Sequence, residues 1–134
     1  MNIPNGVTSI GESSFYLCSN LTLLSISNSV TSIGNYAFGC CYKLETVLFD
    51  GNKEPQYKET PFKDCTILKE ILVPISYEKD TFCLIPVNKT SIIFEICKQN
   101  LSLCSDILDQ MRKKHTKHIN YQRYRWRQGT QLKF

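Results

Sequence analysis

The sequence contains an internal repeat. Val7-Thr8-Ser9-Ile10-Gly11 recurs as Val30-Thr31-Ser32-Ile33-Gly34, and the apolar positions that follow keep the same shift. A third copy, with one residue added, covers Phe62 to Val73, and a polar, proline-containing segment at 51–61 replaces its Val-Thr-Ser-Ile-Gly portion. Val7 and Val30 are 23 residues apart. A repeat of this length is typical of a solenoid, in which each unit packs only against its neighbours. The first half of the chain is therefore predicted to be a stack of about two and a half units.

Each repeat is predicted to contain one short strand. Leu24 and Ile26 are two residues apart and share one face of such a strand, which leaves Leu23 and Ser25 on the other face. Equivalent strands would pair in parallel, at a spacing of about 4.8 Å, and bury a continuous apolar column.

The turns between strands carry recurring aromatic and glycine residues. Segments 12–16 and 35–39 are predicted to form single helical or 3-10 turns, with one phenylalanine of each in the core. Gly11 and Gly34 are expected to adopt a backbone conformation that other residues avoid.

The repeat pattern Ile-Pro-Asn-x-Val-Thr-Ser-Ile-Gly-x-x-x-Phe-x-x-Cys-x-x-Leu-x-x-(Leu/Val)-x-Ile resembles the BspA-type leucine-rich repeat. Residues 3–49 follow the pattern nearly throughout, and residues 62–74 follow its second half. The resemblance implies a leucine-rich-repeat solenoid of short parallel β-strands and tight turns. It also implies the function of such repeats, which form extracellular ligand-binding arrays on mucosal bacteria and protists and take part in adhesion to host proteins and cells.

The composition changes along the chain. Up to Cys97 there are 7 Lys/Arg against 10 Asp/Glu, a net charge of −3, and after it 9 against 2, a net charge of +7. This asymmetry indicates a folded body followed by a basic tail. The expected organisation is a solenoid with a terminal cap at 1–86, a connecting segment at 87–99, an amphipathic helix at 100–115 and a basic, flexible tail at 116–134.

The expected helix follows from apolar residues at three- and four-residue steps, namely Leu101, Cys104, Ile107, Leu108 and Met111. Three alternatives remain open for it: packing on the open end of the solenoid, association with another chain or a membrane surface, or disorder.

The strand faces turned away from the core form the candidate ligand-binding surface. Equivalent positions of parallel strands lie side by side, so this surface consists of three rows. Three leucines are expected to form an apolar centre with a polar surround, which is typical of a contact surface, although single exposed leucines are ordinary on any protein. The candidate residues are Thr22, Glu45 and Lys69; Leu23, Thr46 and Glu70; and Ser25, Leu48 and Leu72.

Seven cysteines leave at least one thiol outside any intrachain disulfide set. Cys18, Cys41 and Cys65 occupy one column of the repeat and are expected to be buried, whereas Cys40 is expected to face outward and to react most readily. No metal site is predicted, because the spacings of Cys97, Cys104, His115 and His118 match no common zinc arrangement. Common catalytic motifs are also missing from the sequence, so we expect neither an enzyme nor a cofactor.

Arginines alternate with aromatic residues in segment 117–127. Such residues can bind phosphates and stack on bases, but the same composition suits an anionic membrane surface or a solvated tail, and nucleic-acid binding is not the expected role. Asn20, Asn88 and Asn100 begin triplets that fit the glycosylation pattern, which matters only in a secretory pathway.

The expected function is that of a non-catalytic protein-binding module that recognises a protein ligand through its parallel-strand face, and the resemblance implies that this ligand is a host or extracellular-matrix protein. The alternatives are a truncated or vestigial structural repeat fragment that associates with other repeats through the solenoid ends, and a nucleic-acid or anionic-membrane binder acting through the basic tail. The resemblance implies a cell-surface or extracellular location, although no signal peptide or membrane span is recognised in the sequence.

Overall fold

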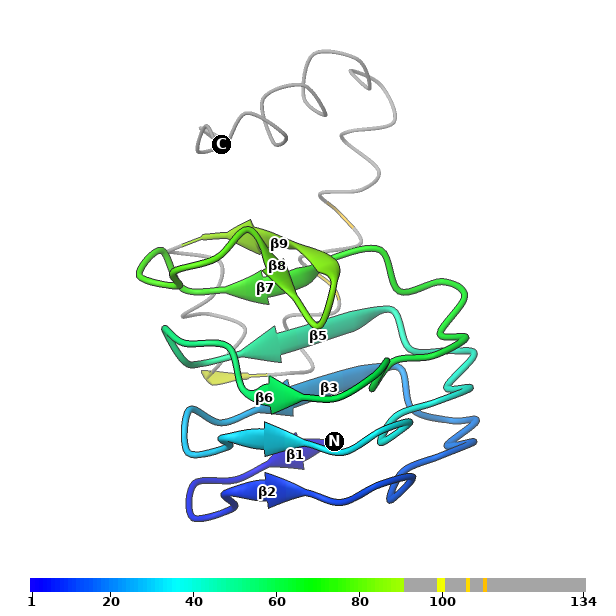
Figure 1. The fold of residues 1–134 in the computed structure, drawn as a ribbon. Coiled ribbons are helices and arrows are strands. Elements are labelled where there is room, and N and C mark those ends of the chain that lie inside the picture. Colours follow the sequence, from blue (N-terminus) through cyan, green and yellow to red (C-terminus); the bar gives the residue numbers. More distant parts are fainter. Residues whose placement is uncertain (91–98, 101–105, 107–109, 111–134) are drawn as a thin grey trace.

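The computed structural model describes residues 1–90, 99–100, 106 and 110, and these residues form a solenoid with two sheets that face each other (Figure 1). The main sheet has the order β1-β3-β5-β7-β9-β8 and the second sheet the order β2-β4-β6. The strands of the main sheet are β1 (Asn2–Ile3), β3 (Leu23–Ile26), β5 (Thr46–Phe49), β7 (Ile71–Val73), β9 (Ile85–Lys89) and β8 (Thr81–Phe82). Those of the second sheet are β2 (Ser9–Ile10), β4 (Ser32–Ile33) and β6 (Gln56–Tyr57).

The sheet register follows the sequence repeat. In the main sheet Ser25 pairs with Leu48 and Leu48 with Leu72, so residues at equivalent positions of successive repeats lie side by side. All neighbouring strands are parallel except β8 and β9, which form an antiparallel hairpin. The predicted solenoid of parallel strands is confirmed, and it has about three turns rather than two and a half.

The core lies between the two sheets and is built from equivalent residues of successive repeats. Phe15, Phe38 and Phe62 form a continuous stack, with ring centroids 5.2 and 5.4 Å apart and rings within 4° and 11° of parallel. At the C-terminal end, Tyr77 and Phe82 are buried and pack against Phe49. The core is therefore closed at this end by side chains of the segment that follows β7.

The turns differ from the predicted helical or 3-10 geometry. Ser13 and Tyr36 have positive φ angles of 53° and 54°, and Leu17 and Cys40 have φ angles of 60° and 55°. A residue in this left-handed region interrupts a right-handed helical turn, so segments 12–16 and 35–39 form turns of another kind. Because these conformations recur at equivalent positions, they belong to the repeat.

The expectation for Gly11 and Gly34 is also wrong, because among the described glycines only Gly6 has a positive φ angle, of 97°. A Cβ atom at Gly34 would instead lie 2.4 Å from the backbone nitrogen of Glu12. Close approach of neighbouring turns, rather than an unusual φ angle, requires glycine at position 34.

The third repeat keeps a strand that its sequence conceals. Gln56 and Tyr57 of β6 pair in parallel with Ser32 and Ile33, although segment 51–61 has no Val-Thr-Ser-Ile motif. The third repeat thus keeps the parallel strand register of the second sheet although its sequence lacks the motif.

The main sheet also extends past Pro86 to Lys89, so the first residues of the expected connecting segment at 87–99 belong to a strand. Val87, Asn88 and Lys89 pair with β7, whereas Pro86 pairs with Thr81 in the hairpin. Pro86 therefore lies before the part of β9 that pairs with β7, and it does not interrupt that parallel pairing. The predicted amphipathic helix at 100–115, except for residues 100, 106 and 110, and the tail at 116–134 lie outside the described residues.

Candidate interaction surfaces

The side of the main sheet turned away from the core is called the outer face here. The alternation of side chains along each strand places Leu23 and Ser25 of β3, Thr46 and Leu48 of β5, and Leu72 of β7 on this face. Leu23 lies beside Thr46, and Leu48 lies between Ser25 and Leu72. The structure thus aligns the two predicted rows within the strands as expected.

The remaining candidate residues lie just before the strands. Thr22, Glu45 and Lys69 are exposed, and Glu70 is half-buried. The carbonyl of Thr22 accepts hydrogen bonds from the backbone amides of Glu45 and Thr46, at 3.0 and 3.3 Å. These residues form a charged border along one edge of the outer face.

The outer face is less exposed than its sequence pattern predicts. Leu48 and Leu72 are each only 2% exposed and Thr46 is 7% exposed. Leu23 and Ser25 are half-buried. The expectation of exposed leucines at the centre is therefore wrong for Leu48 and Leu72, because strand alternation shows which side a residue faces but not whether that side is covered.

The cysteine column is largely as predicted. Cys41 and Cys65 are buried, and Cys18 is half-buried. The thiol of Cys65 donates a hydrogen bond to the carbonyl of Phe38, at 3.0 Å, and that of Cys41 donates to the carbonyl of Phe15, at 3.4 Å. Burial raises the pKa of Cys65 to about 11, so this thiol is protonated at neutral pH and is a poor nucleophile or metal ligand.

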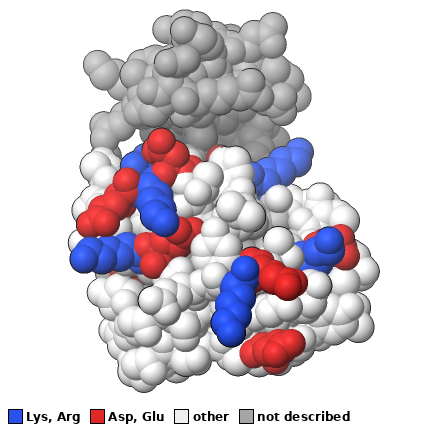
Figure 2. Space-filling model, in the orientation of Figure 1, with Lys and Arg blue, Asp and Glu red and all other residues white. Residues whose placement is uncertain are grey.

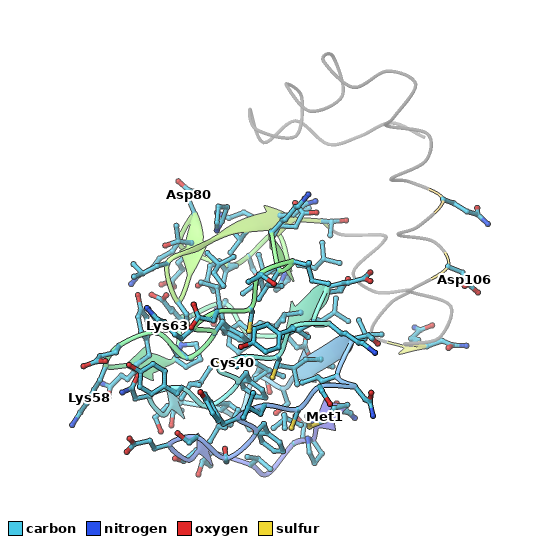
Figure 3. All side chains as sticks on the ribbon, turned by 90° about the vertical axis from the view of Figure 1, so that its right-hand side faces the viewer. Met1, Cys40, Lys58, Lys63, Asp80 and Asp106 are labelled. Atoms are coloured by element: carbon cyan, nitrogen blue, oxygen red, sulfur yellow. The ribbon has the colours of Figure 1, made fainter. Side chains whose placement is uncertain are left out.

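Cys40 does not match its prediction. It is absent from the core cluster, but it is only 7% exposed and its sulfur lies 3.4 Å from the Tyr16 hydroxyl. Figure 3 shows Cys40 on the side of the solenoid that carries the turns. The tyrosine covers this thiol, so facing away from the core does not expose it.

The outward side of the second sheet carries a hydroxyl ladder that the sequence reasoning did not identify as a surface. Ser32 Oγ donates to Ser9 Oγ and Thr31 Oγ1 to the carbonyl of Thr8, both at 3.1 Å. A groove of about 740 Å³ lies along this sheet and continues past Gln56. The recurrence of Thr-Ser at equivalent positions of the repeat could have indicated the ladder. Figure 2 shows this side, with acidic and basic side chains interspersed rather than gathered by sign.

A buried carboxylate joins the third repeat to the C-terminal cap. Glu54 has a side chain only 7% exposed and occupies the position of Val30 in the preceding repeat. Its carboxylate accepts hydrogen bonds from Lys79 Nζ and from the backbone amide of Cys83, both at 2.7 Å. Sequence comparison of the repeats finds no signal for this contact, because the partners come from outside the repeat pattern.

Among residues 1–90, 99–100, 106 and 110, no three His, Cys, Asp or Glu residues come together as a group that could hold a metal ion. Cys97, Cys104, His115 and His118 lie outside these residues, as does the basic segment 117–127. The amide nitrogen of Asn88, where a glycan would attach, is buried, whereas Asn20 and Asn100 are exposed. Within the same described part of the chain, no helix is long and apolar enough to cross a membrane.

A solenoid of parallel strands whose register follows the sequence repeat, with a leucine, a cysteine and a phenylalanine column in its core, is the structure of a leucine-rich-repeat protein. The sequence model of the BspA type leucine rich repeat region (6 copies) matches residues 1–107, and the chain belongs to this family. Searches of curated proteins and of solved structures gave no match. Leucine-rich repeats generally mediate protein interactions and are generally non-catalytic, and surface antigens and adhesion are general associations of the BspA type.

Proposed function

We propose that the chain is a non-catalytic protein-binding module that recognises a protein ligand through its outer face. The observation that carries this proposal is the position of Leu48 and Leu72. These leucines lie side by side on the outer face, whereas their strand neighbours Val47 and Ile71 already fill the core side. An apolar pair outside the core, bordered by residues of both charges, is the arrangement found at the centre of protein contact surfaces. Because both leucines are only 2% exposed, a ligand contacts them only when it displaces the atoms that cover them, whereas the half-buried Leu23 is partly accessible.

The solenoid also supports recognition through its rigidity. The outer-face residues come from different repeats, but hydrogen-bonded parallel strands hold them in register. A ligand that binds such a surface meets side chains whose backbone is already ordered, so little conformational entropy is lost on the module's side.

The proposed ligand is a protein of the host surface or extracellular matrix, and the proposed location is the cell surface. BspA-type repeats are typically found in surface proteins, which supports both proposals. A non-catalytic role agrees with the chemistry of the buried thiols, since burial raises the pKa of Cys41 and of Cys65 and keeps both in the unreactive protonated form.

The proposal predicts that charge on the outer face abolishes binding. The full chain is tested against surfaces coated with fibronectin, laminin or collagen, in parallel with Leu23→Asp and with the double variant Glu45→Lys/Leu48→Asp. Leu23 is half-buried, so its variant is expected to fold. Because a central contact residue often contributes about 2 kcal/mol or more, both variants should bind at least about tenfold more weakly.

The matched control is Gln56→Asp, which places the same charge on an exposed residue of the second sheet. This variant should bind as the unmodified chain does. Circular dichroism verifies that each variant is folded. Unchanged binding by folded Leu23→Asp, or an equal loss in Gln56→Asp, would refute the assignment of the outer face.

A further inference from the structure

The core does not account for the burial of the outer face. The core cluster includes Val47 and Val73 but neither Leu48 nor Leu72, although the latter two are each only 2% exposed. Both faces of β5 and β7 are thus buried, as in sheets that are covered on both sides. A second group of atoms must shield the outer face at these two strands.

The burial is graded along the sheet. Asn2 of β1 is exposed and Ser25 of β3 is half-buried, whereas Leu48 of β5 and Leu72 of β7 are buried. In β9, next in the sheet, the amide nitrogen of Asn88 is buried without a hydrogen-bond partner. The shielding is therefore centred over β5, β7 and β9, and β9 is the last strand within residues 1–90.

The sequence beyond β9 contains a segment suited to this position. Residues 91–99 can span up to about 30 Å when extended, enough to turn back over the sheet. Segment 100–115 then has the apolar stripe described above. Asp106 and Gln110 are four residues apart, lie opposite the stripe on a helix and are exposed. Figure 3 shows Asp106 on the outer side of the main sheet, away from Lys58, which follows β6.

Charge favours the same placement. The border of the outer face has two acidic residues, Glu45 and Glu70, against one basic residue, Lys69. The apolar stripe is followed by the basic residues Arg112, Lys113 and Lys114. The C-terminal end of the core offers less apolar surface for a helix to cover, because Tyr77 and Phe82 already close it. An apolar helix face therefore gains more from the outer face than from the solenoid end.

We propose that segment 100–115 docks as an amphipathic helix on the outer face of its own chain and covers Leu48 and Leu72. Because a short tether gives an effective concentration on the order of millimolar, this intramolecular contact excludes weak competitors. A protein ligand of the outer face must displace the segment, so its apparent affinity is reduced by the fraction of molecules in which the face is covered. This regulatory consequence, unlike the docking, rests on the proposed function.

The docking is tested in the full chain with the photo-crosslinking amino acid p-benzoylphenylalanine in place of Leu23. Illumination should give an intramolecular cross-link to a peptide within residues 100–115, in a yield independent of protein concentration. The same amino acid in place of Gln56, on the second sheet, should give no such cross-link. Mass spectrometry identifies the linked peptides.

Two substitutions within the segment sharpen the test. Leu108→Asp places a charge in the apolar stripe and should reduce the cross-link from position 23 to background. Gln110→Asp places the same charge on the opposite side of the segment and should leave the yield unchanged. Equal yields in both variants would overturn the proposal, as would cross-links that form only between molecules or to no residue of 100–115.

The outcome is separable from that of the proposed function. If the cross-link forms but folded Leu108→Asp binds none of the three coated surfaces, the docking stands and the proposed ligand class fails. If the Leu108→Asp variant binds a coated surface more tightly than the unmodified chain does, both the docking and its regulatory role are supported. If no cross-link to residues 100–115 forms without the Leu108→Asp substitution, the docking proposal is refuted whatever the binding result.

Discussion

At the scale of single residues, Gly34 brings the backbones of neighbouring repeats into close contact. The amide of Gly34 donates a hydrogen bond of 2.7 Å to the carbonyl of Ile10, and a Cβ atom on Gly34 would lie 2.4 Å from the Glu12 nitrogen. A real Cβ atom does not approach backbone so closely, so the absence of a side chain at position 34 sets the distance between neighbouring turns. Gly11, at the equivalent position, has no atom within 4 Å of its Cβ position.

The two glycines should therefore respond differently to the same substitution. Gly34→Ala forces neighbouring backbone apart and should lower the free energy of unfolding by about 1–3 kcal/mol, the usual cost of overpacking. Gly11→Ala meets open space and should be neutral or stabilise by up to about 1 kcal/mol through reduced entropy of the unfolded chain. Urea unfolding of both variants measures the difference. Equal effects at the two positions would show that repeat spacing does not depend on this contact.

At the scale of elements, the β8–β9 hairpin is attached to the repeats by both apolar and polar contacts. Phe82 of β8 packs against Phe49 of β5, with ring centroids 4.8 Å apart. Glu54 accepts a hydrogen bond from the amide of Cys83, in the turn of the hairpin. The carboxylate thus joins an irregular repeat to a segment that has no counterpart in the other repeats.

Removal of this carboxylate should loosen the hairpin. Glu54→Ala leaves the Cys83 amide without its partner, so the free energy of unfolding should fall by about 1–3 kcal/mol. Lys79→Ala removes the other partner, whose side chain is 62% exposed, and should cost less than about 1 kcal/mol. Hydrogen exchange at the Cys83 amide should become faster in Glu54→Ala only. If that amide keeps its protection in Glu54→Ala, the carboxylate does not hold the hairpin.

At the scale of the whole molecule, buried thiols and a buried phenol make the free energy of unfolding depend on pH in the alkaline range. Burial raises the pKa of Cys65 from 9.0 to about 11 and also raises the pKa values of Cys41, Cys83 and Tyr77. Above pH 9 the unfolded chain has ionised thiols while the folded chain keeps its protons. The folded state then binds more protons, so stability decreases as the pH rises.

The free energy of unfolding should therefore be nearly constant up to about pH 8 and should fall as the pH rises from 9 towards 11. Urea unfolding across this range, with a reducing agent present, measures the slope. Cys65→Ala removes one of the titrating groups and should give a shallower slope than the unmodified chain between pH 9 and 11. A slope identical in the two proteins would show that Cys65 does not titrate as its burial implies.

Much of the solenoid could be predicted because residues at equivalent positions of successive repeats pack against one another. The constant shift between equivalent positions is sufficient to predict the strands at Leu24 and Val47, their parallel register and the burial of Cys41. The turn geometry could not be predicted in this way, since positive φ angles at Ser13 and Tyr36 fall on residue types that do not require them.

The period of the sequence was thus sufficient for the stack, its strand register and its core, because neighbouring repeats provide each other's packing environment. Only the tertiary structure revealed the burial of Leu48, Leu72 and Cys40, the hidden strand at Gln56 and the extension of the sheet through β9. Cys40 is covered by Tyr16 of the neighbouring repeat, and the strand at Gln56 pairs with β4 although its own segment lacks the motif. The shielding of Leu48 and Leu72 comes from outside the core cluster. A periodic signal assigns a side chain to one face of the sheet, but only the remaining chain decides whether that face meets solvent.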